Sequence, residues 1–284
     1  MTNLVKTEFG YYRADPVPSD AELHDWYSKK YYSSVHPEMY RKENAEEREW
    51  LARECRWAAE DLLRLRPEAR TSGLLDIGCG PAYLMAEMHR RGFAVTGIDP
   101  DPGAAAHYNP DVAGAVSAGS WQDIVNEPGP SYDWINLSGV LEHVRDPSQT
   151  VESLKQRLAP GGVVRISVPN DFNVFQKAIQ ANGLAKDQYW VNPPEHLSYF
   201  SLESLTRLVE FHGFELLYSH GDFPIDMFLL MGRDYTRTPE VGEQCHFERM
   251  RFEAALEDET LRKIYAELPK LGIGRTLTIY ISVA

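Results

Sequence analysis

Glycine and aspartate residues between positions 76 and 99 have the types and the spacing needed to hold a nucleoside. A short apolar run leads into Asp76, and Gly78 and Gly80 follow before residues 81–88, which show helical spacing. Glycine at these positions lets the backbone approach a ligand where a Cβ atom would clash. A second apolar run, FAVTGID, ends at Asp99, where a carboxylate can accept hydrogen bonds from both ribose hydroxyls. The pattern predicts a strand, a glycine turn and a helix that bind an adenosine compound.

The absence of two phosphate-binding motifs indicates which kind of adenosine compound this turn binds. A dinucleotide fingerprint needs a third glycine three residues after the second, but that position is Tyr83. A phosphate-binding P-loop ends in Gly-Lys-Ser or Gly-Lys-Thr, and the sequence contains neither run. The site is therefore predicted to bind a nucleoside without a pyrophosphate.

Between Gly73 and Phe214 the chain resembles the class I S-adenosylmethionine (SAM) dependent methyltransferases, with four motifs in the expected order. DIGCG is similar to their cofactor loop, and Asp99 to their ribose-binding acid. AGSWQDI resembles the segment beside the adenine ring, YDWINLSGVLEHVRDP the fourth strand and its turn, and LAPGGVVRISVP the fifth strand. The resemblance implies SAM as cofactor and S-adenosylhomocysteine as product. It also implies a set of cofactor-binding residues, namely Asp76, Gly78, Cys79, Gly80, Asp99, Pro100, Ser120, Trp121, Leu137 and Tyr31.

The predicted fold is α/β, with a Rossmann-like, seven-stranded class I methyltransferase sheet that is mostly parallel and has an antiparallel last strand. Short apolar runs alternate with helical patterns, as in a parallel sheet whose ligands bind at the carboxyl ends of its strands. The predicted strands are residues 73–77, 93–98, 113–117, 132–137, 163–168, 215–223 and 275–284.

Residues 1–72 are predicted to form a helical cap before this core. Ser19 begins a capping box that starts one helix, and residues 44–65 carry the apolar stripe of a second, longer helix. Tyrosines crowd the stretch between them. Their hydroxyls suit a lid over the methionine carboxylate of the cofactor, although tyrosines half-buried against the core would give the same pattern. These residues are Tyr27, Tyr31, Tyr32 and Tyr40.

Two further segments leave the predicted sheet. Residues 169–200 form an excursion of a length that is usually functional, so they are predicted to be a lid loop. Residues 224–274 carry helical patterns where class I methyltransferases usually have a short hairpin. Two roles are open for this insertion, a substrate cap or the surface of a homodimer. The predicted division is 1–72 as cap, 73–223 as SAM-binding core with the 169–200 lid, 224–274 as insertion and 275–284 as last strand.

His143 follows the predicted fourth strand in the segment VLEHV and is a candidate catalytic residue. The segment resembles that of ubiquinone-pathway O-methyltransferases and small-RNA 3′-end methyltransferases, whose glutamate-x-x-glutamate-histidine cluster is associated with a divalent metal. Here Gly139 takes the first glutamate position, so Glu142 and His143 are too few ligands and no catalytic metal is predicted. The alternative is that Glu142 and His143 only cap and orient the turn.

His196, near the end of the long excursion, is the second candidate catalytic residue. Pro193 and Pro194 stiffen the chain before it. A histidine here could bind the acceptor or remove its proton, whereas the alternative is a structural bond to the loop backbone. Nearby aromatic side chains are predicted to form walls of an acceptor pocket: Tyr189, Trp190, Tyr199 and Phe200.

The charge, the cysteine content and the apolar segments of the chain limit the kinds of molecule that it could bind and the compartment in which it is expected. The net charge is −13, from 42 acidic and 29 basic residues, which disfavours nucleic acid or an anionic membrane as the main partner. Cys55, Cys79 and Cys245 are far apart in the sequence and show no CxxC pair, which argues against a disulfide framework or a zinc site. No signal-peptide pattern and no membrane-spanning apolar run are present, so a cytoplasmic protein is expected.

These observations lead to one principal hypothesis about function. The chain is predicted to methylate a hydroxyl oxygen of a small molecule, of sugar, quinone or natural-product type. The alternatives are N- or C-methylation, protein methylation, and a SAM-binding protein without turnover.

Overall fold

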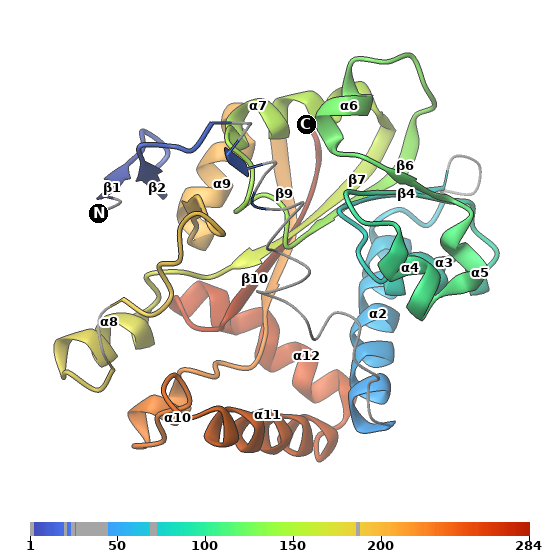
Figure 1. The fold of residues 1–284 in the computed structure, drawn as a ribbon. Helices are drawn as coiled ribbons and strands as arrows, with labels where there is room; N and C mark the ends of the chain where they lie inside the picture. The colour runs from blue at the N-terminus through green and yellow to red at the C-terminus, as the bar shows by residue number, and fades with distance from the viewer. Residues whose placement is uncertain (1–2, 20–21, 24–25, 27–44, 69–72, 186–187) are drawn as a thin grey trace.

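A seven-stranded sheet forms the centre of the molecule (Figure 1). The computed structural model describes residues 3–19, 22–23, 26, 45–68, 73–185 and 188–284. Neighbouring strands are parallel except for β10, which runs antiparallel to both β7 and β9, so the predicted sheet and its antiparallel last strand are confirmed. The strands lie in the order β5 (Val116–Ala118), β4 (Val95–Asp99), β3 (Leu74–Ile77), β6 (Tyr132–Ser138), β7 (Leu158–Pro169), β10 (Thr276–Val283) and β9 (Phe214–Gly221).

Helices cover both faces of this sheet, as expected for parallel strands that alternate with helices. Each parallel crossover carries the chain back over one face, so the loops that follow the strands gather at one edge. The connecting elements are α3 (Tyr83–Arg90), α4 (Gly103–Tyr108), α5 (Pro110–Ala113), α6 (Trp121–Val125), α7 (Pro147–Ser153), η3 (Leu154–Gln156), α8 (Val174–Ala181) and α9 (Leu202–Phe211).

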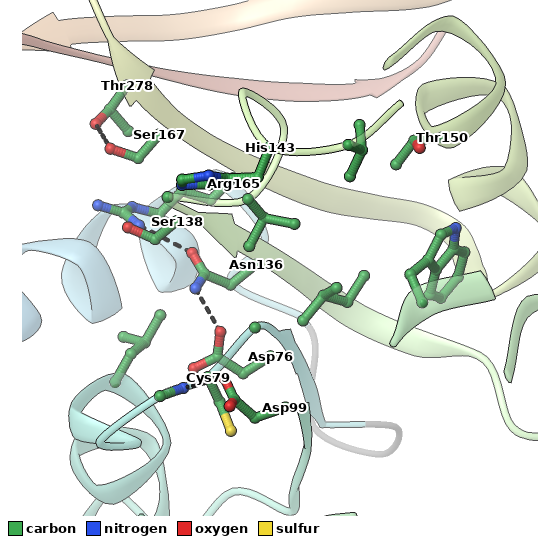
Figure 2. Close-up of a pocket in the computed structure, with 18 of the residues that line it drawn as sticks. Asp76, Cys79, Asp99, Asn136, Ser138, His143, Thr150, Arg165, Ser167 and Thr278 are labelled. Atoms are coloured by element: carbon green, nitrogen blue, oxygen red, sulfur yellow. Dashed lines mark hydrogen bonds between the residues drawn. The ribbon is translucent and has the colours of Figure 1, made fainter. Parts of the chain in front are cut away.

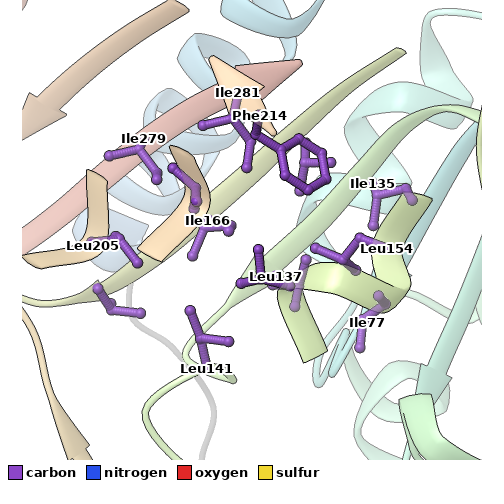
Figure 3. Close-up of a cluster of buried hydrophobic side chains, with 14 of the residues drawn as sticks. Ile77, Ile135, Leu137, Leu141, Leu154, Ile166, Leu205, Phe214, Ile279 and Ile281 are labelled. Carbon is purple, nitrogen blue, oxygen red and sulfur yellow. The ribbon is translucent and has the colours of Figure 1, made fainter. Parts of the chain in front are cut away.

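Side chains alternate between the two faces of the strands, so the sheet has one hydrophobic core on each face. Ile135, Leu137 and Ile166 point toward the face covered by α7 and α9, where they pack with Leu154 and Leu205 (Figure 3). The intervening residues of the same strands point to the opposite face, which is covered by α3 and by α2 (Ala45–Leu65). Because side chains alternate with a period of two, the face of each strand residue is determined by its register.

The amino-terminal residues form a small sheet that the sequence analysis did not predict. β1 (Asn3–Lys6) and β2 (Tyr12–Asp15) pair as an antiparallel hairpin, and β2 also pairs with β8 (Ser198–Tyr199). This pairing joins parts of the chain that are far apart in sequence, so local patterns do not reveal it. The tyrosine-rich stretch, including Tyr31, lies outside the described residues.

The predicted insertion is helical and packs onto α2. Its elements are α10 (Met227–Leu230), α11 (Pro239–Ala254), α12 (Asp258–Glu267) and η4 (Leu268–Leu271). The buried carboxylate of Glu253 accepts hydrogen bonds from Trp50 Nε1 at 2.6 Å, Arg53 Nη2 at 2.9 Å and Tyr265 Oη at 2.6 Å. Breaking such a buried, charge-assisted network is costly, so the network ties α11 and α12 to the core.

Candidate cofactor and acceptor site

A cavity of about 1610 Å³ lies at the carboxyl edge of the sheet (Figure 2). Its walls come from the loops after β3, β4, β5 and β6, from α2, and from strands β7, β9 and β10. Ten of the twelve residues predicted from sequence line it, which are Asp76, Gly78, Cys79, Gly80, Asp99, Pro100, Ser120, Trp121, His143 and His196.

The glycine turn connects β3 to α3. Gly78 and Gly80 have φ angles of +66° and +46°, in the left-handed region that favours glycine. A Cβ atom on Gly78 would lie 2.5 Å from Cγ2 of Val140, too close for any real contact. The backbone N–H groups of Gly78 and Cys79 donate to the Ile98 carbonyl at 2.8 and 3.3 Å. These bonds hold the turn against the end of β4.

Asp99 ends β4 and is 3% exposed. Its Oδ2 accepts a hydrogen bond from the Gly80 N–H at 2.8 Å, and its Oδ1 accepts one from the Asp101 N–H at 2.8 Å. These two bonds hold the carboxylate beside the glycine turn and the cavity. The predicted ribose-binding residue and the predicted glycine turn therefore form one hydrogen-bonded unit.

Asp76 begins a chain of polar side chains that crosses three strands. Its Oδ1 accepts from Asn136 Nδ2 at 2.6 Å, and Asn136 Oδ1 in turn accepts from Arg165 Nη1 at 2.9 Å (Figure 2). Burial raises the pKa of Asp76 to about 7, against the opposing effect of the Asn136 bond. The chain extends the predicted cofactor site from β3 across β6 to β7.

The predicted adenine side lies at the start of α6. Ser120 caps this helix, and Asp123 Oδ2 accepts from the Ser120 N–H at 2.7 Å and from its Oγ at 2.8 Å. Trp121 lines the cavity and also belongs to the buried core, where its Nε1 donates to Ser153 Oγ at 2.6 Å. Leu137 does not line the cavity, because it points to the α7 and α9 face and packs in the core. We therefore leave Leu137 out of the proposed site.

The two candidate catalytic histidines lie side by side. The rings of His143 and His196 are 4.9 Å apart and nearly perpendicular. His143 Nε2 lies 3.8 Å from Glu142 Oε1. The Glu142 carbonyl accepts the N–H groups of Leu197 and Ser198 at 2.8 and 3.1 Å, which holds the end of the long loop against the turn after β6. We call Glu142, His143 and His196 the histidine cluster.

Hydrogen bonding determines which nitrogen of His143 carries the proton. Its Nδ1 lies 2.6 Å from the carbonyl oxygen of Glu195, and a carbonyl can only accept. In the neutral ring, Nδ1 therefore donates and Nε2 holds the lone pair on the side of Glu142. Burial raises the pKa of Glu142 to about 8.

The histidine cluster also has the composition of a divalent-cation site. Its possible ligand atoms all lie within 4.8 Å of one another. Glu142 is 3% exposed, and among the described residues its Oε2 has no hydrogen-bond partner. Two imidazoles and one carboxylate suit several transition metals, and a ligand histidine is commonly oriented through its other nitrogen, as Glu195 orients His143. The residues present therefore fit a metal, with His196 as the ligand that the sequence count did not include.

A sequence profile described as a methyltransferase domain matches residues 48–219, well over half of the chain. This match includes the glycine turn, Asp99 and the histidine cluster. The chain belongs to the methyltransferase domain family. Together with the sheet order, this membership shows a methyltransferase domain with the class I fold.

Curated relatives and solved structures agree with this assignment. The methyltransferase is 34% identical over 139 residues to the ubiquinone biosynthesis O-methyltransferase of Caulobacter vibrioides, covering 43% of this chain and 50% of the relative. It is 32% identical over 176 residues to the enzyme of that name from another Caulobacter strain, covering 56% of this chain and 65% of the relative. These matches span less than two thirds of either relative.

Two solved structures have the same fold over nearly the whole methyltransferase. A putative sarcosine dimethylglycine methyltransferase from Galdieria sulphuraria has a TM-score of 0.52 at 16% identity, covering 92% of this chain and 96% of the other. The plantazolicin methyltransferase BamL has a TM-score of 0.54 at 15% identity, covering 92% and 93%. At these identities the likeness concerns the fold alone.

Sequence reasoning missed several polar residues that line the site of the methyltransferase. Asn136 was a detectable signal, because a polar residue in an otherwise apolar, buried strand needs a partner. Asp123 also had a signal, since it follows Ser120 at the spacing of a capping box. The sequence signal for Arg165 was weaker, because a charged residue in the predicted fifth strand is also compatible with a strand at the edge of the sheet.

Replacing Asp99 with alanine is expected to weaken SAM binding by about 1.5–3 kcal/mol, the usual range for hydrogen bonds to a charged group. The variant loses the carboxylate that orients Gly80 and the acceptor proposed for the ribose hydroxyls. Calorimetric titration with SAM measures the change. Asp111→Ala, at an exposed site on α5, is the matched control and should bind as the unmodified protein does. Unchanged affinity in Asp99→Ala would remove Asp99 from the site.

Trp121→Ala should lower the free energy of unfolding by about 3–5 kcal/mol, because it empties a large volume in a packed core. Trp121→Phe keeps most of that volume and loses the bond to Ser153, so it should cost much less. Denaturant unfolding compares the two variants, and SAM titration follows each. A Trp121→Ala variant with unchanged stability and weakened SAM binding would instead show that the indole contacts the adenine.

Proposed function

We propose that the methyltransferase moves the methyl group of SAM to a hydroxyl oxygen of a small-molecule acceptor. The histidine cluster carries this proposal, because it lines the cofactor cavity after β6 with two imidazoles. A hydroxyl must lose its proton to become a good nucleophile, and histidine is the side chain best suited to accept it near neutral pH. The relatives named O-methyltransferases support oxygen as the acceptor atom.

The reaction is an in-line displacement at the methyl carbon. The acceptor oxygen forms a bond to this carbon while the carbon–sulfur bond breaks, leaving S-adenosylhomocysteine, and the hydroxyl proton moves to a base. Alignment supplies much of the rate in such a reaction. In our proposal, Asp99 and the glycine turn hold the nucleoside, while the His143 and His196 rings receive the acceptor hydroxyl. With no cation bound, the bond to Glu195 leaves the Nε2 lone pair of His143 as the acceptor of the proton, whereas a cation in the cluster would coordinate that lone pair and activate the hydroxyl itself.

We further propose that three segments close the acceptor side and exclude water. One is the tyrosine-rich stretch of residues 1–72, and the second is the 169–200 loop that ends near His196. The third is the 224–274 insertion, whose Glu253 lines the cavity. The division of the chain into cap, core with lid, insertion and last strand remains part of this proposal, as does a homodimer. No helix among the described residues is both long and apolar enough to cross a membrane.

Paired acceptors test the proposed acceptor atom. The purified enzyme is incubated with SAM and with catechols or monosaccharides, and separately with counterparts in which every hydroxyl is replaced by a methoxy group. S-adenosylhomocysteine and the methylated product are quantified by mass spectrometry. We expect product only where a hydroxyl is present. Turnover of amines that carry no hydroxyl, without turnover of any hydroxyl compound, would contradict O-methylation.

Chelation tests whether the histidine cluster holds a metal. The sequence predicted none on a count of two ligands, and because the structure supplies a third, we replace that prediction with a bound divalent cation. A cation held here would lower the pKa of a bound hydroxyl. Dialysis against a chelator should therefore slow turnover at least about tenfold, with S-adenosylhomocysteine affinity unchanged, and manganese, magnesium or zinc should restore it. Unchanged turnover after verified metal removal would show that the histidines assist removal of the hydroxyl proton without a metal.

A further inference from the structure

Polar side chains occupy the α2 face of the sheet near the carboxyl ends of its strands. Parallel strands covered on both sides are normally apolar on both faces. Here Asn136 pairs with Arg165 across β6 and β7. One step nearer the edge, Thr278 of β10 pairs with Ser167 and His220 on its two neighbours, and the Ser167 and Thr278 hydroxyls are 2.9 Å apart (Figure 2). Burying polar groups costs free energy, so these rows indicate a function other than packing.

These side chains line the cavity instead of packing tightly against α2. Glu54 and Cys55 of α2 face the same part of the cavity, and both are only partly buried although they lie inside the fold. The volume of about 1610 Å³ exceeds the roughly 300–1,000 Å³ of an ordinary small-molecule pocket, which leaves room for an acceptor beside the cofactor. We call the part lined by Glu54, Arg165, His220, Asp222 and Thr278 the polar chamber.

The polar chamber contains more acidic than basic groups. Burial, together with the negative charges of Glu253 and Asp222, raises the pKa of Glu54 to about 7, although Arg53 and Arg165 act in the opposite direction. Burial likewise raises the pKa of Asp222. His220 is neutral near pH 7, because burial lowers its pKa to about 4. Of the five residues that define the chamber, Arg165 is therefore the only cation.

Some hydrogen-bond donors and acceptors in the polar chamber make no hydrogen bond to the described residues. Arg165 donates through Nη1 to Asn136, whereas its buried Nε has no partner in the part of the chain that the structure describes. Within the described part of the chain, no hydrogen bond involves the Glu54 carboxylate. Asp222 Oδ1 already accepts from the N–H groups of Arg275 and Thr276 at 2.8 and 2.7 Å. A complementary ligand therefore presents a hydrogen-bond donor, preferably a charged one, to Glu54 beside the Asp222 carboxylate, and an oxygen acceptor to Arg165.

We propose that the polar chamber binds a protonated amine and neighbouring hydroxyls of the acceptor, the combination found in an amino sugar. This inference rests on the small-molecule methyl transfer proposed above and adds the class of acceptor. The amine lies between Glu54 and Asp222 and supplies the missing positive charge, while hydroxyl oxygens accept from Arg165. An acceptor recognised mainly through a long apolar chain would displace water from these polar groups without giving them partners, at a large cost in affinity.

Cys55 offers a probe of this chamber that needs no knowledge of the natural acceptor. The protein is saturated with S-adenosylhomocysteine and treated with 2-aminoethyl methanethiosulfonate, a cation, or 2-sulfonatoethyl methanethiosulfonate, an anion of similar size. Mass spectrometry of the Cys55 peptide gives each rate, normalised to that of a small free thiol. Burial raises the pKa of the Cys55 thiol to about 12, which slows both reagents equally and leaves their ratio informative.

We expect the cationic reagent to react at least about tenfold faster than the anionic one, as a local excess of negative charge requires. Glu54→Gln should reduce this ratio severalfold, and Glu49→Gln, at an exposed position of the same helix, should not. Added D-glucosamine should slow the cationic reagent more than D-glucuronate does at the same concentration.

A ratio near one, no effect of Glu54→Gln, or protection by D-glucuronate that equals or exceeds that by D-glucosamine would each overturn the proposal. Cofactor binding is measured separately by calorimetry, so failure of the proposed function is distinguishable from failure of the amine site.

Discussion

Replacing His196 with alanine is expected to lower turnover by about 10²–10⁴-fold, the range typical for loss of a group that assists proton transfer. His196 completes the histidine cluster, and its ring lies 4.9 Å from that of His143 on the acceptor side of the cavity. SAM affinity should stay within a few tenths of a kcal/mol, at most about twofold, because the proposed nucleoside contacts lie in the glycine turn and at Asp99. Steady-state kinetics with saturating SAM, together with calorimetry of SAM binding, measures the two effects.

The histidine at position 107 provides a control for this experiment. It is exposed on α4 and does not line the cavity, so His107→Ala should keep both turnover and SAM affinity. If SAM affinity falls in parallel with turnover in His196→Ala, or if neither changes, His196 has a structural role. The acceptor proton must then be removed through His143 or through another group.

Gly78→Val should abolish measurable SAM binding, a loss of more than about 100-fold. The residue has φ +66°, which costs a side-chain-bearing residue about 1–2 kcal/mol. Its new Cβ would also lie 2.5 Å from Val140 Cγ2, so the Val140 side chain or the turn itself must shift. The side chain also opposes the left-handed conformation that lets the turn backbone approach the cofactor. Calorimetric titration with SAM measures the loss.

Gly114→Val separates a local effect on the turn from a general effect of valine. Gly114 has φ −65°, and a Cβ there would meet nothing within 4 Å, so this variant should bind SAM normally. Circular dichroism and thermal unfolding confirm that the Gly78→Val protein is folded. A folded Gly78→Val protein that binds SAM with unchanged affinity would show that the turn does not contact the cofactor.

The sequence by itself determined the sheet and the cofactor turn, because these features depend on residues close together in the chain. Apolar runs separated by helical patterns predicted the strands, and the structure confirms a seven-stranded sheet with an antiparallel β10. The positive φ of Gly78 and the position of Asp99 at the end of β4 follow from a local strand–turn–helix pattern. The same alternation could have excluded Leu137, which faces the side opposite Asn136.

Only the tertiary structure decided which distant residues share a site. His196 joins Glu142 and His143 because the 169–200 loop returns to the turn after β6, and no local pattern contains that contact. The pairing of β2 with β8 depends on the same return of the chain. The polar chamber combines residues of α2, β7, β9 and β10. In the sequence, no single one of these polar residues indicates that they share a site. Sequence periodicity records which face of an element is buried, whereas packing alone determines what that face meets.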